Sequence, residues 1–297
     1  MPSDLKPYLN EKRQRVNDYL EGALRSREKD CPAALLEAMR YSLLAPGKRL
    51  RPLLVMMAAE ASGGRGENPL PAAAAVEMVH TYSLIHDDLP AMDDDELRRG
   101  RPTCHVAYGE DTAILAGDGL YAEAFLHLLT RQSGEPANIM RAAAELAAAT
   151  GVNGMVGGQF LDVAASAPAG AEGLRHVHEL KTGRLIRASV ECVLLIEGRQ
   201  GPATIEQFEN FAGELGVLFQ IVDDILDVTG SDEALGKPSG SDERLGKRTY
   251  VTEFGLDGAR GLAQDAHRKA SEALASAATR DPHQLQQITD FIARRSF

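Results

Sequence analysis

The chain has 297 residues, of which 44% are hydrophobic and 25% are charged, and its formal net charge is −11 at pH 7. This length and composition allow a full-sized buried core, as in an ordinary globular protein. The acidic balance and the lack of a basic tail argue against nucleic-acid binding, which depends on neutralising phosphates. A polyanionic ligand would need either clustered Lys and Arg side chains or a bound metal ion.

The cysteines and the N-terminal residues indicate a compartment. Cys31, Cys104 and Cys192 are widely spaced and form neither a CxxC pair nor a disulfide framework, which is typical of buried cysteines in a reducing compartment. Residues 1–24 are charged throughout, and no run approaches the ~20 apolar residues of a membrane span. We therefore expect a cytoplasmic protein without a membrane-spanning segment.

Helical periodicity dominates the chain. Apolar residues recur at three- and four-residue steps in residues 8–24 and 76–84, and the Ala-rich stretch 141–150 also favours helix. Alternating, strand-like runs are scarce. The breaks between these stretches are short and rich in Gly and Pro: residues 62–71, 133–137, 165–173 and 198–202. We predict an all-α fold, a single large helical bundle in which residues 1–297 form one domain.

The first acidic cluster spans residues 87–96, with the sequence DDLPAMDDDE. Pro90 cannot continue a helix because it lacks an N–H and its ring clashes with the preceding turn. The chain should therefore leave the helix near Asp88, and a bend would bring Asp93 back towards Asp87. Taken alone, this cluster could also be an exposed acidic turn.

The second acidic cluster consists of Asp223, Asp224 and Asp227, preceded by Gln220. These four residues share one helical face, and their neighbours are strongly apolar. Carboxylates gathered on such a helix repel each other and are costly to desolvate, so a cation should compensate them. Mg²⁺ does so because it prefers oxygen ligands and shares them with substrate phosphates. The two clusters together indicate paired metal sites.

Basic residues accompany the two clusters. They are Lys48 and Arg51 in the motif GKRLRP, Arg98 and Arg99 after the first cluster, Lys181 in a predicted helix, and Lys237 and Lys247 in a Gly- and Ser-rich stretch. Each alone could be a surface charge, but together, in an acidic chain, they indicate phosphate binding. The stretch 230–249 is predicted to be a mobile loop of the kind that often covers an active site.

These motifs carry a resemblance to a known family. The segment from His80 to Gly100 resembles the first aspartate-rich motif of bacterial farnesyl diphosphate synthases, which are trans-prenyl diphosphate synthases with four residues between the Asp pair and the next Asp. The motifs GKRLRP, GGQ at residues 157–159, KTG at residues 181–183, FQ with DDILD, and the two Gly-Lys pairs resemble the family's other motifs in the same order. The match covers roughly residues 35–250.

The resemblance implies a fold, a reaction and the role of each motif. It implies a helical bundle of the isoprenoid synthase type with a central cavity, in which isopentenyl diphosphate is joined head to tail to dimethylallyl or geranyl diphosphate to give farnesyl diphosphate. The implied metal set, for three Mg²⁺ ions with substrate bound, is Asp87, Asp88, Asp93, Asp223, Asp224 and Asp227, in which Asp88, Asp224 and Asp227 support the other three. The implied allylic-substrate set is Arg98, Lys181, Thr182, Gln220, Lys237 and Lys247, with Thr182 near the reacting carbon. The implied isopentenyl-diphosphate set is Lys48, Arg51, His80 and Arg99. A homodimer is implied as well.

Ionisation of the allylic diphosphate is the difficult step, and the residues expected to be catalytic are Asp87, Asp88, Asp93, Arg98, Lys181, Thr182 and Asp223. Closure of the 230–249 loop would exclude water from the resulting carbocation. In the family, residues just before the first Asp pair line the channel for the growing chain. Tyr82 and Ser83 are expected to occupy that level, with Tyr82 as a floor that stops growth near fifteen carbons.

Other functions are weighed against this one. A terpene cyclase is disfavoured because the chain has no Trp and carries two acidic clusters with a second basic site. A geranylgeranyl diphosphate synthase is harder to separate. A catalytically silent regulatory subunit of a prenyl synthase is the third alternative, although both acidic clusters are intact.

Overall fold

The computed structural model describes residues 4–63, 68–164, 166, 168, 170–230, 248–277 and 280–294. Its helices are α1 (Leu5–Arg25), α2 (Ala33–Leu43), α3 (Leu50–Ala61), α4 (Leu70–Asp87), α5 (Cys104–Tyr108), α6 (Glu110–Arg131), α7 (Pro136–Thr150), α8 (Met155–Val163), α9 (Gly170–His178), α10 (Arg184–Glu197), α11 (Pro202–Thr229), α14 (Tyr250–Ser276) and α15 (His283–Arg294), with a π-helical turn, η1 (Glu179–Gly183), between α9 and α10. The predicted all-α fold is confirmed.

The helix boundaries follow the predicted breaks. Three helices have a proline at their first or second position, Pro71 in α4, Pro136 in α7 and Pro202 in α11, where the missing N–H costs no hydrogen bond. One break is shorter than expected, because α9 already begins at Gly170. The Lys181 motif, expected in a regular helix, lies in the π-turn η1.

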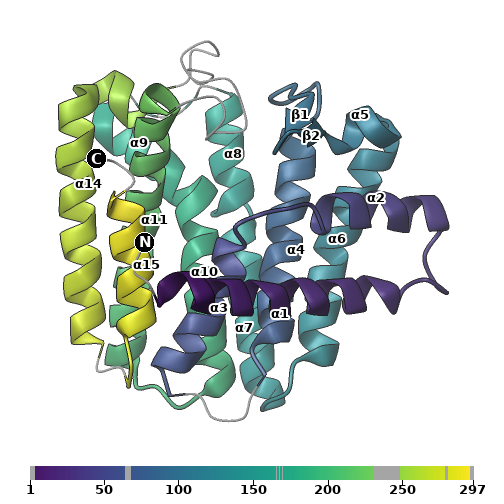
Figure 1. Ribbon diagram of the computed structural model, residues 1–297, viewed down its shortest axis with the longest axis horizontal. Coiled ribbons are helices and arrows are strands. Elements are labelled where there is room, and N and C mark those ends of the chain that lie inside the picture. Colours follow the sequence, from purple (N-terminus) through teal and green to yellow (C-terminus); the bar gives the residue numbers. More distant parts are fainter. Residues whose placement is uncertain are drawn as a thin grey trace.

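The core is a central layer of α3, α4 and α10 enclosed by the other helices (Figure 1). In α3 and α4, runs of buried residues cover almost the full circumference of each helix, which is the pattern of a helix enclosed on all sides. One cluster of buried apolar residues extends from Val16 in α1 to Ile292 in α15. The start of α1 lies beside the start of α15, since Asp4 accepts hydrogen bonds from His283 and Gln287.

A short hairpin interrupts the helical pattern after the first acidic cluster. Strands β1 (Leu97–Arg98) and β2 (Arg101–Pro102) pair antiparallel, and the two residues between them, Arg99 and Gly100, both have positive φ. This is the backbone of a two-residue hairpin turn. The sequence analysis did not predict the hairpin, because the sequence here does not alternate between apolar and polar residues.

Three further sequence expectations concern the cysteines, a membrane-spanning segment and the 230–249 loop. All three cysteines are free, as expected. Among the described residues, no helix is both long and apolar enough to cross a membrane. Lys237, Lys247 and most of the predicted 230–249 loop lie outside the described residues.

Candidate active site

The end of α4 forms the predicted bend. The helix ends at Asp87, and the backbone N–H of Asp93 donates to the carbonyl of Asp87 at 2.9 Å. Pro90 lies in the turn, and Asp94 has a φ of 53°. The bend brings Asp93 beside Asp87, as the position of the proline predicts.

Asp88 points away from this pair and is held by the hairpin. Its carboxylate Oδ1 accepts from Arg98 Nε at 2.6 Å, and the residue is only 3% exposed. Arg98 also reaches Asp95 at 3.4 Å. Burial raises the pKa of Asp88, and the Arg98 guanidinium opposes that rise. The hairpin therefore returns Arg98 to the cluster, where Asp88 positions it.

The carboxyl group of Asp87 has a raised pKa. Burial raises its pKa to about 6, and the nearby Asp93 and Asp88 carboxylates add to the rise, while Lys181 and Arg98 oppose it. A carboxylate in this position favours a neighbouring cation. Within the described parts of the chain, no three His, Cys, Asp or Glu side chains are grouped closely enough to hold a metal ion by themselves. The donor set fits Mg²⁺ nonetheless, because this ion commonly takes one or two carboxylates and completes its shell with water and substrate phosphate.

The basic motif at residues 47–52 lies at the start of α3, next to α4. Arg51 Nη1 lies 3.3 Å from His80 Nε2. Arginine has only donors, so this ring nitrogen must be the unprotonated acceptor. The pKa of His80 is correspondingly held well below its usual value by burial and by Arg51. Lys48 is exposed in the loop before α3.

Arg49, to which the sequence analysis gave no role, holds this loop in place. It is buried, pairs with Glu77 of α4 at 2.6 Å, and donates to the carbonyls of Leu43 and Ala45. From outside, Arg99 Nη1 donates to the carbonyl of Pro46 at 2.9 Å. A Cβ at position 47 would meet the Arg99 guanidinium, so any larger residue there would require this arginine to move. A short loop with one arginine inside it and one on its surface is fixed on both sides.

The opposite wall is formed by η1 and α8. Lys181 Nζ lies 2.6 Å from Asp162 Oδ2 of α8, and Thr182 Oγ1 donates to Gln220 Oε1 of α11 at 3.4 Å. The helices approach closely because Gly158 faces the backbone of Lys181, where a Cβ would have no room. The GGQ motif therefore has a packing role at its second glycine.

The members of the second acidic cluster differ in their surroundings. Asp223 is exposed, whereas Asp224 and Asp227 are buried. Asp224 accepts hydrogen bonds from Gln220 and from the backbone N–H of Tyr250, at 2.8 Å each. Sharing a helical face does not give these residues equal exposure, because the start of α14 covers Asp224.

A cavity of about 430 Å³ lies between the two walls. Its lining joins α3, α4, α8 and η1, and the predicted site residues that line it are Arg51, His80, Tyr82, Ser83, Asp87, Lys181 and Thr182. Asp88, Arg98 and Arg99 line a smaller hollow of about 50 Å³ on the other side of α4. The second acidic cluster does not line the main cavity, but Gln220 connects it to Thr182 in the wall.

The polyprenyl synthetase family model matches residues 32–292. The chain belongs to this family. As a prenyl diphosphate synthase, it is similar over 99% of its length to the chloroplastic geranylgeranyl pyrophosphate synthase of Capsicum annuum, with 45% identity and 79% of that protein covered. It is 42% identical to the chloroplastic geranylfarnesyl diphosphate synthase of Leucosceptrum canum, over 98% of this chain and 80% of that one.

Solved structures agree with this assignment. The synthase superposes on a geranyltransferase from Legionella pneumophila with a TM-score of 0.86 and 35% identity, covering 98% of both chains. An FPP/GFPP synthase from Zymomonas mobilis gives a TM-score of 0.83 and 33% identity, covering 99% of this chain and all of that one. The chloroplastic relatives run against the expected cytoplasmic location, which stays a prediction.

Proposed function

We propose that this synthase condenses isopentenyl diphosphate with dimethylallyl and geranyl diphosphate to give farnesyl diphosphate. The observation that carries the proposal is the position of Tyr82 in the cavity wall, between one and two helical turns before Asp87 on α4. Its ring packs edge-on against Tyr121 of α6 with centroids 4.8 Å apart, and Tyr121 packs in the same way on Phe125. Edge-to-face contacts between aromatic rings are favourable, and we assign these three rings to the floor that limits the growing chain.

Two groups of basic side chains are assigned to the two diphosphates. For isopentenyl diphosphate they are Arg51, which lines the cavity, and Arg99, which lines the smaller hollow, with Lys48 exposed in the loop before α3 and neutral His80 as a hydrogen-bonding partner of Arg51. For the allylic diphosphate they are Lys181 in the cavity wall and Arg98 of the hairpin, and Lys237 and Lys247, outside the described residues, are assigned to that substrate from the family resemblance. Cations placed on both diphosphates orient the two substrates for head-to-tail attack.

Mg²⁺ would be held by Asp87 and Asp93 and, across the site, by Asp223, with Asp88, Asp224 and Asp227 behind them. When bound, the ion stabilises the negative charge that develops on the departing diphosphate. Lys181 and Arg98 stabilise the same charge, and a cation ~4 Å away contributes on the order of 4 kcal/mol at an effective dielectric of 20. Thr182, beside Lys181 in the cavity lining, is assigned to the reacting carbon from the family resemblance. The apolar lining by Met155, Val156 and Phe160 limits water around the cationic carbon.

A twenty-carbon product is the second candidate, and the names of the plant relatives favour it. These relatives and the Zymomonas structure differ in their named products although all match nearly the whole chain. Overall similarity therefore does not decide chain length, and the side chains on the cavity floor are the better guide.

The test is a product assay. The purified chain is incubated with radiolabelled isopentenyl diphosphate, Mg²⁺ and either dimethylallyl or geranyl diphosphate, and the products are sized by chromatography. A fifteen-carbon product that disappears with EDTA supports the proposal. A twenty-carbon product transfers support to the second candidate, and the lack of any product with either starter favours a regulatory subunit.

We further propose that residues 1–297 act as one domain and that two copies form a homodimer through α6. The single apolar cluster from α1 to α15 supports the proposal of one domain.

The proposal of a homodimer rests on an exposed apolar row on α6. Its members recur at helical spacing and are Leu115, Ala122, Leu126 and Leu129. A row of exposed apolar side chains on one face, three of them leucines, is typical of a protein interface. Light scattering should give twice the chain mass, and Leu126→Asp with Leu129→Asp should give the chain mass; a monomeric wild type would contradict the proposal.

A further inference from the structure

The start of α14 is a separate structural unit beside the second acidic cluster. The helix begins at Tyr250, but Gly255 has a φ of 70° and interrupts its backbone. Residues 250–254 therefore form a first turn that the long helix after the interruption does not hold rigidly. The position of this turn depends on the contacts that its own residues make.

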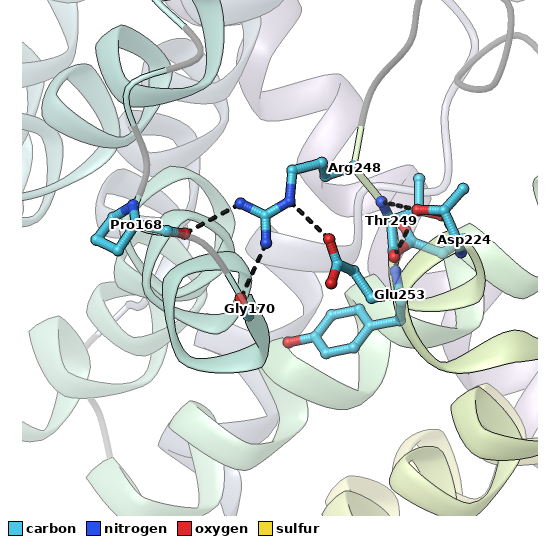
Figure 2. Close-up of polar contacts among 8 residues, drawn as sticks. Pro168, Gly170, Asp224, Arg248, Thr249 and Glu253 are labelled. Carbon is cyan, nitrogen blue, oxygen red and sulfur yellow. Dashed lines mark hydrogen bonds and ion pairs between the residues drawn. The ribbon is translucent and has the colours of Figure 1, made fainter.

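One contact comes from α11. Figure 2 shows Asp224 against the chain at Thr249, where its Oδ2 accepts the backbone N–H of Tyr250 at 2.8 Å. Its Oδ1 accepts from Gln220 Nε2 at the same distance, and the residue is almost fully buried. The first N–H groups of a helix lack partners within it and attract negative charge. Asp224 thus caps the first turn of α14 from a neighbouring helix.

A second contact involves Pro168 and Gly170, at the start of α9. The Arg248 guanidinium donates to the carbonyls of Pro168 and Gly170 at 3.0 Å each, and its Nε pairs with Glu253 at 2.7 Å (Figure 2). These three contacts use the planar fork of arginine, which lysine cannot reproduce. Arg248 therefore joins the first turn, through Glu253, to a segment almost 80 residues earlier in the chain.

The first turn is linked to η1 indirectly by two routes. Through Asp224 it reaches Gln220, whose Oε1 accepts from Thr182. The Tyr250 ring lies 5.2 Å, centroid to centroid, from the ring of His178, the residue directly before η1. A shift of the turn would therefore be transmitted to the element that carries Lys181 and Thr182.

We propose that Asp224 and Arg248 are positioning residues, which fix the first turn of α14 and through it hold η1 so that Lys181 and Thr182 stay in the cavity wall. The kinetic consequence rests on the proposed prenyl transfer, whereas the structural consequence rests only on the contacts. This role is additional to the metal-binding role proposed for the second acidic cluster.

The structural consequence is tested by hydrogen exchange of the full chain without substrate. Asp224→Asn and Arg248→Ala should both speed exchange of the amides in residues 250–254 and in residues 179–183. The matched control is Arg268→Ala, also on α14, whose guanidinium pairs only with Asp265 and Glu272 on the same helix among the described contacts. The control should change neither segment. Faster exchange confined to residues 250–254, or no change, would overturn the coupling.

The kinetic consequence is tested with Arg248→Ala and Arg248→Lys, because Arg248 is partly exposed and its replacement is tolerated even if Asp224→Asn does not fold. Misplaced Lys181 and Thr182 should lower kcat and raise KM for the allylic diphosphate, by about 10- to 100-fold in kcat/KM, with KM for isopentenyl diphosphate unchanged. If Asp224→Asn folds, the loss in the double variant Asp224→Asn/Arg248→Ala should be smaller than the product of the two single losses, because both residues act on one turn. A lower Tm with unchanged KM values would reduce the role to stability and overturn the proposal.

A wild-type chain without any product would refute the proposed function, while the exchange experiment would still decide the coupling.

Discussion

Lys181 Nζ lies 2.6 Å from Asp162 Oδ2, so a cation assigned to the allylic diphosphate already has a carboxylate partner on α8. The two side chains are 24% and 30% exposed, and ion pairs at such sites contribute only ~0.2–1 kcal/mol. A diphosphate carries several charges and binds lysine more strongly than one partly hydrated carboxylate does. The pair therefore holds Lys181 in place without preventing substrate binding.

The first prediction concerns this pair. Lys181→Ala should raise KM for geranyl diphosphate at least about tenfold, which corresponds to ~1.4 kcal/mol, because it removes a direct charge contact. Asp162→Asn keeps the lysine and removes only its partner, so its KM should stay within about threefold of wild type. Steady-state kinetics at saturating isopentenyl diphosphate measures both. An unchanged KM in Lys181→Ala would contradict the assignment.

The second prediction concerns the cavity floor. Tyr82→Ala should shift the products beyond fifteen carbons, because it opens the channel towards Tyr121 and Phe125. Tyr82→Phe keeps the ring and should keep the product length, which makes it the matched control. Chromatography of the dephosphorylated products distinguishes the two. The same product profile in the wild type and Tyr82→Ala would show that Tyr82 is ordinary core.

The third prediction concerns the buried pair beneath the basic loop. Arg49→Ala leaves Glu77 buried without its partner, and such changes destabilise proteins by about 3–5 kcal/mol. Urea unfolding should show this loss. Any folded protein should also have a higher KM for isopentenyl diphosphate, because the loop with Lys48, which leads into α3 and Arg51, loses its inner support. Arg40→Ala, which removes a half-exposed arginine from α2, is the control and should cost no more than about 1 kcal/mol.

The fourth prediction concerns pH and Glu191 of α10. Burial raises the pKa of Glu191 to about 7; Glu145 of α7 and Glu209 of α11 add to the rise, and Arg187 opposes it. The folded chain therefore holds this proton more tightly than the unfolded chain, in which a glutamate titrates at ~4.3. The stabilisation is fully present below that value and is lost as the pH rises through about 7.

Glu191→Gln removes this titration. At pH 8 the Tm of the variant should exceed that of the wild type by ~2–4 °C for each kcal/mol of unfolding free energy that the variant regains. Near pH 4.5 the two Tm values should be equal. Glu206→Gln, at an exposed position of α11, is the matched control and should follow the wild type at both pH values. A difference in Tm that is equal at both pH values would mean that packing, and not the charge, is responsible.

The local features of this chain could be predicted from its sequence. Helical periodicity, proline-started helices and the bend at Pro90 depend on residues close together in the chain, so they follow from backbone sterics and hydrogen bonding alone. The chemistry of the acidic and basic motifs also follows from residue type. For this reason the all-α fold, the return of Asp93 to Asp87 and the family were all predicted correctly.

The tertiary structure decided what depends on distant segments. Arg49, one residue from a predicted substrate ligand, is buried against Glu77, and only the packing of α3 on α4 distinguishes it from Arg51. Asp224, one residue from Asp223, caps a helix that begins 26 residues later. Adjacent residues on a helix point about 100° apart, so neighbours of the same type meet different surroundings. Those surroundings, and not the motif, fix the pKa, the partner and the role of each charged group.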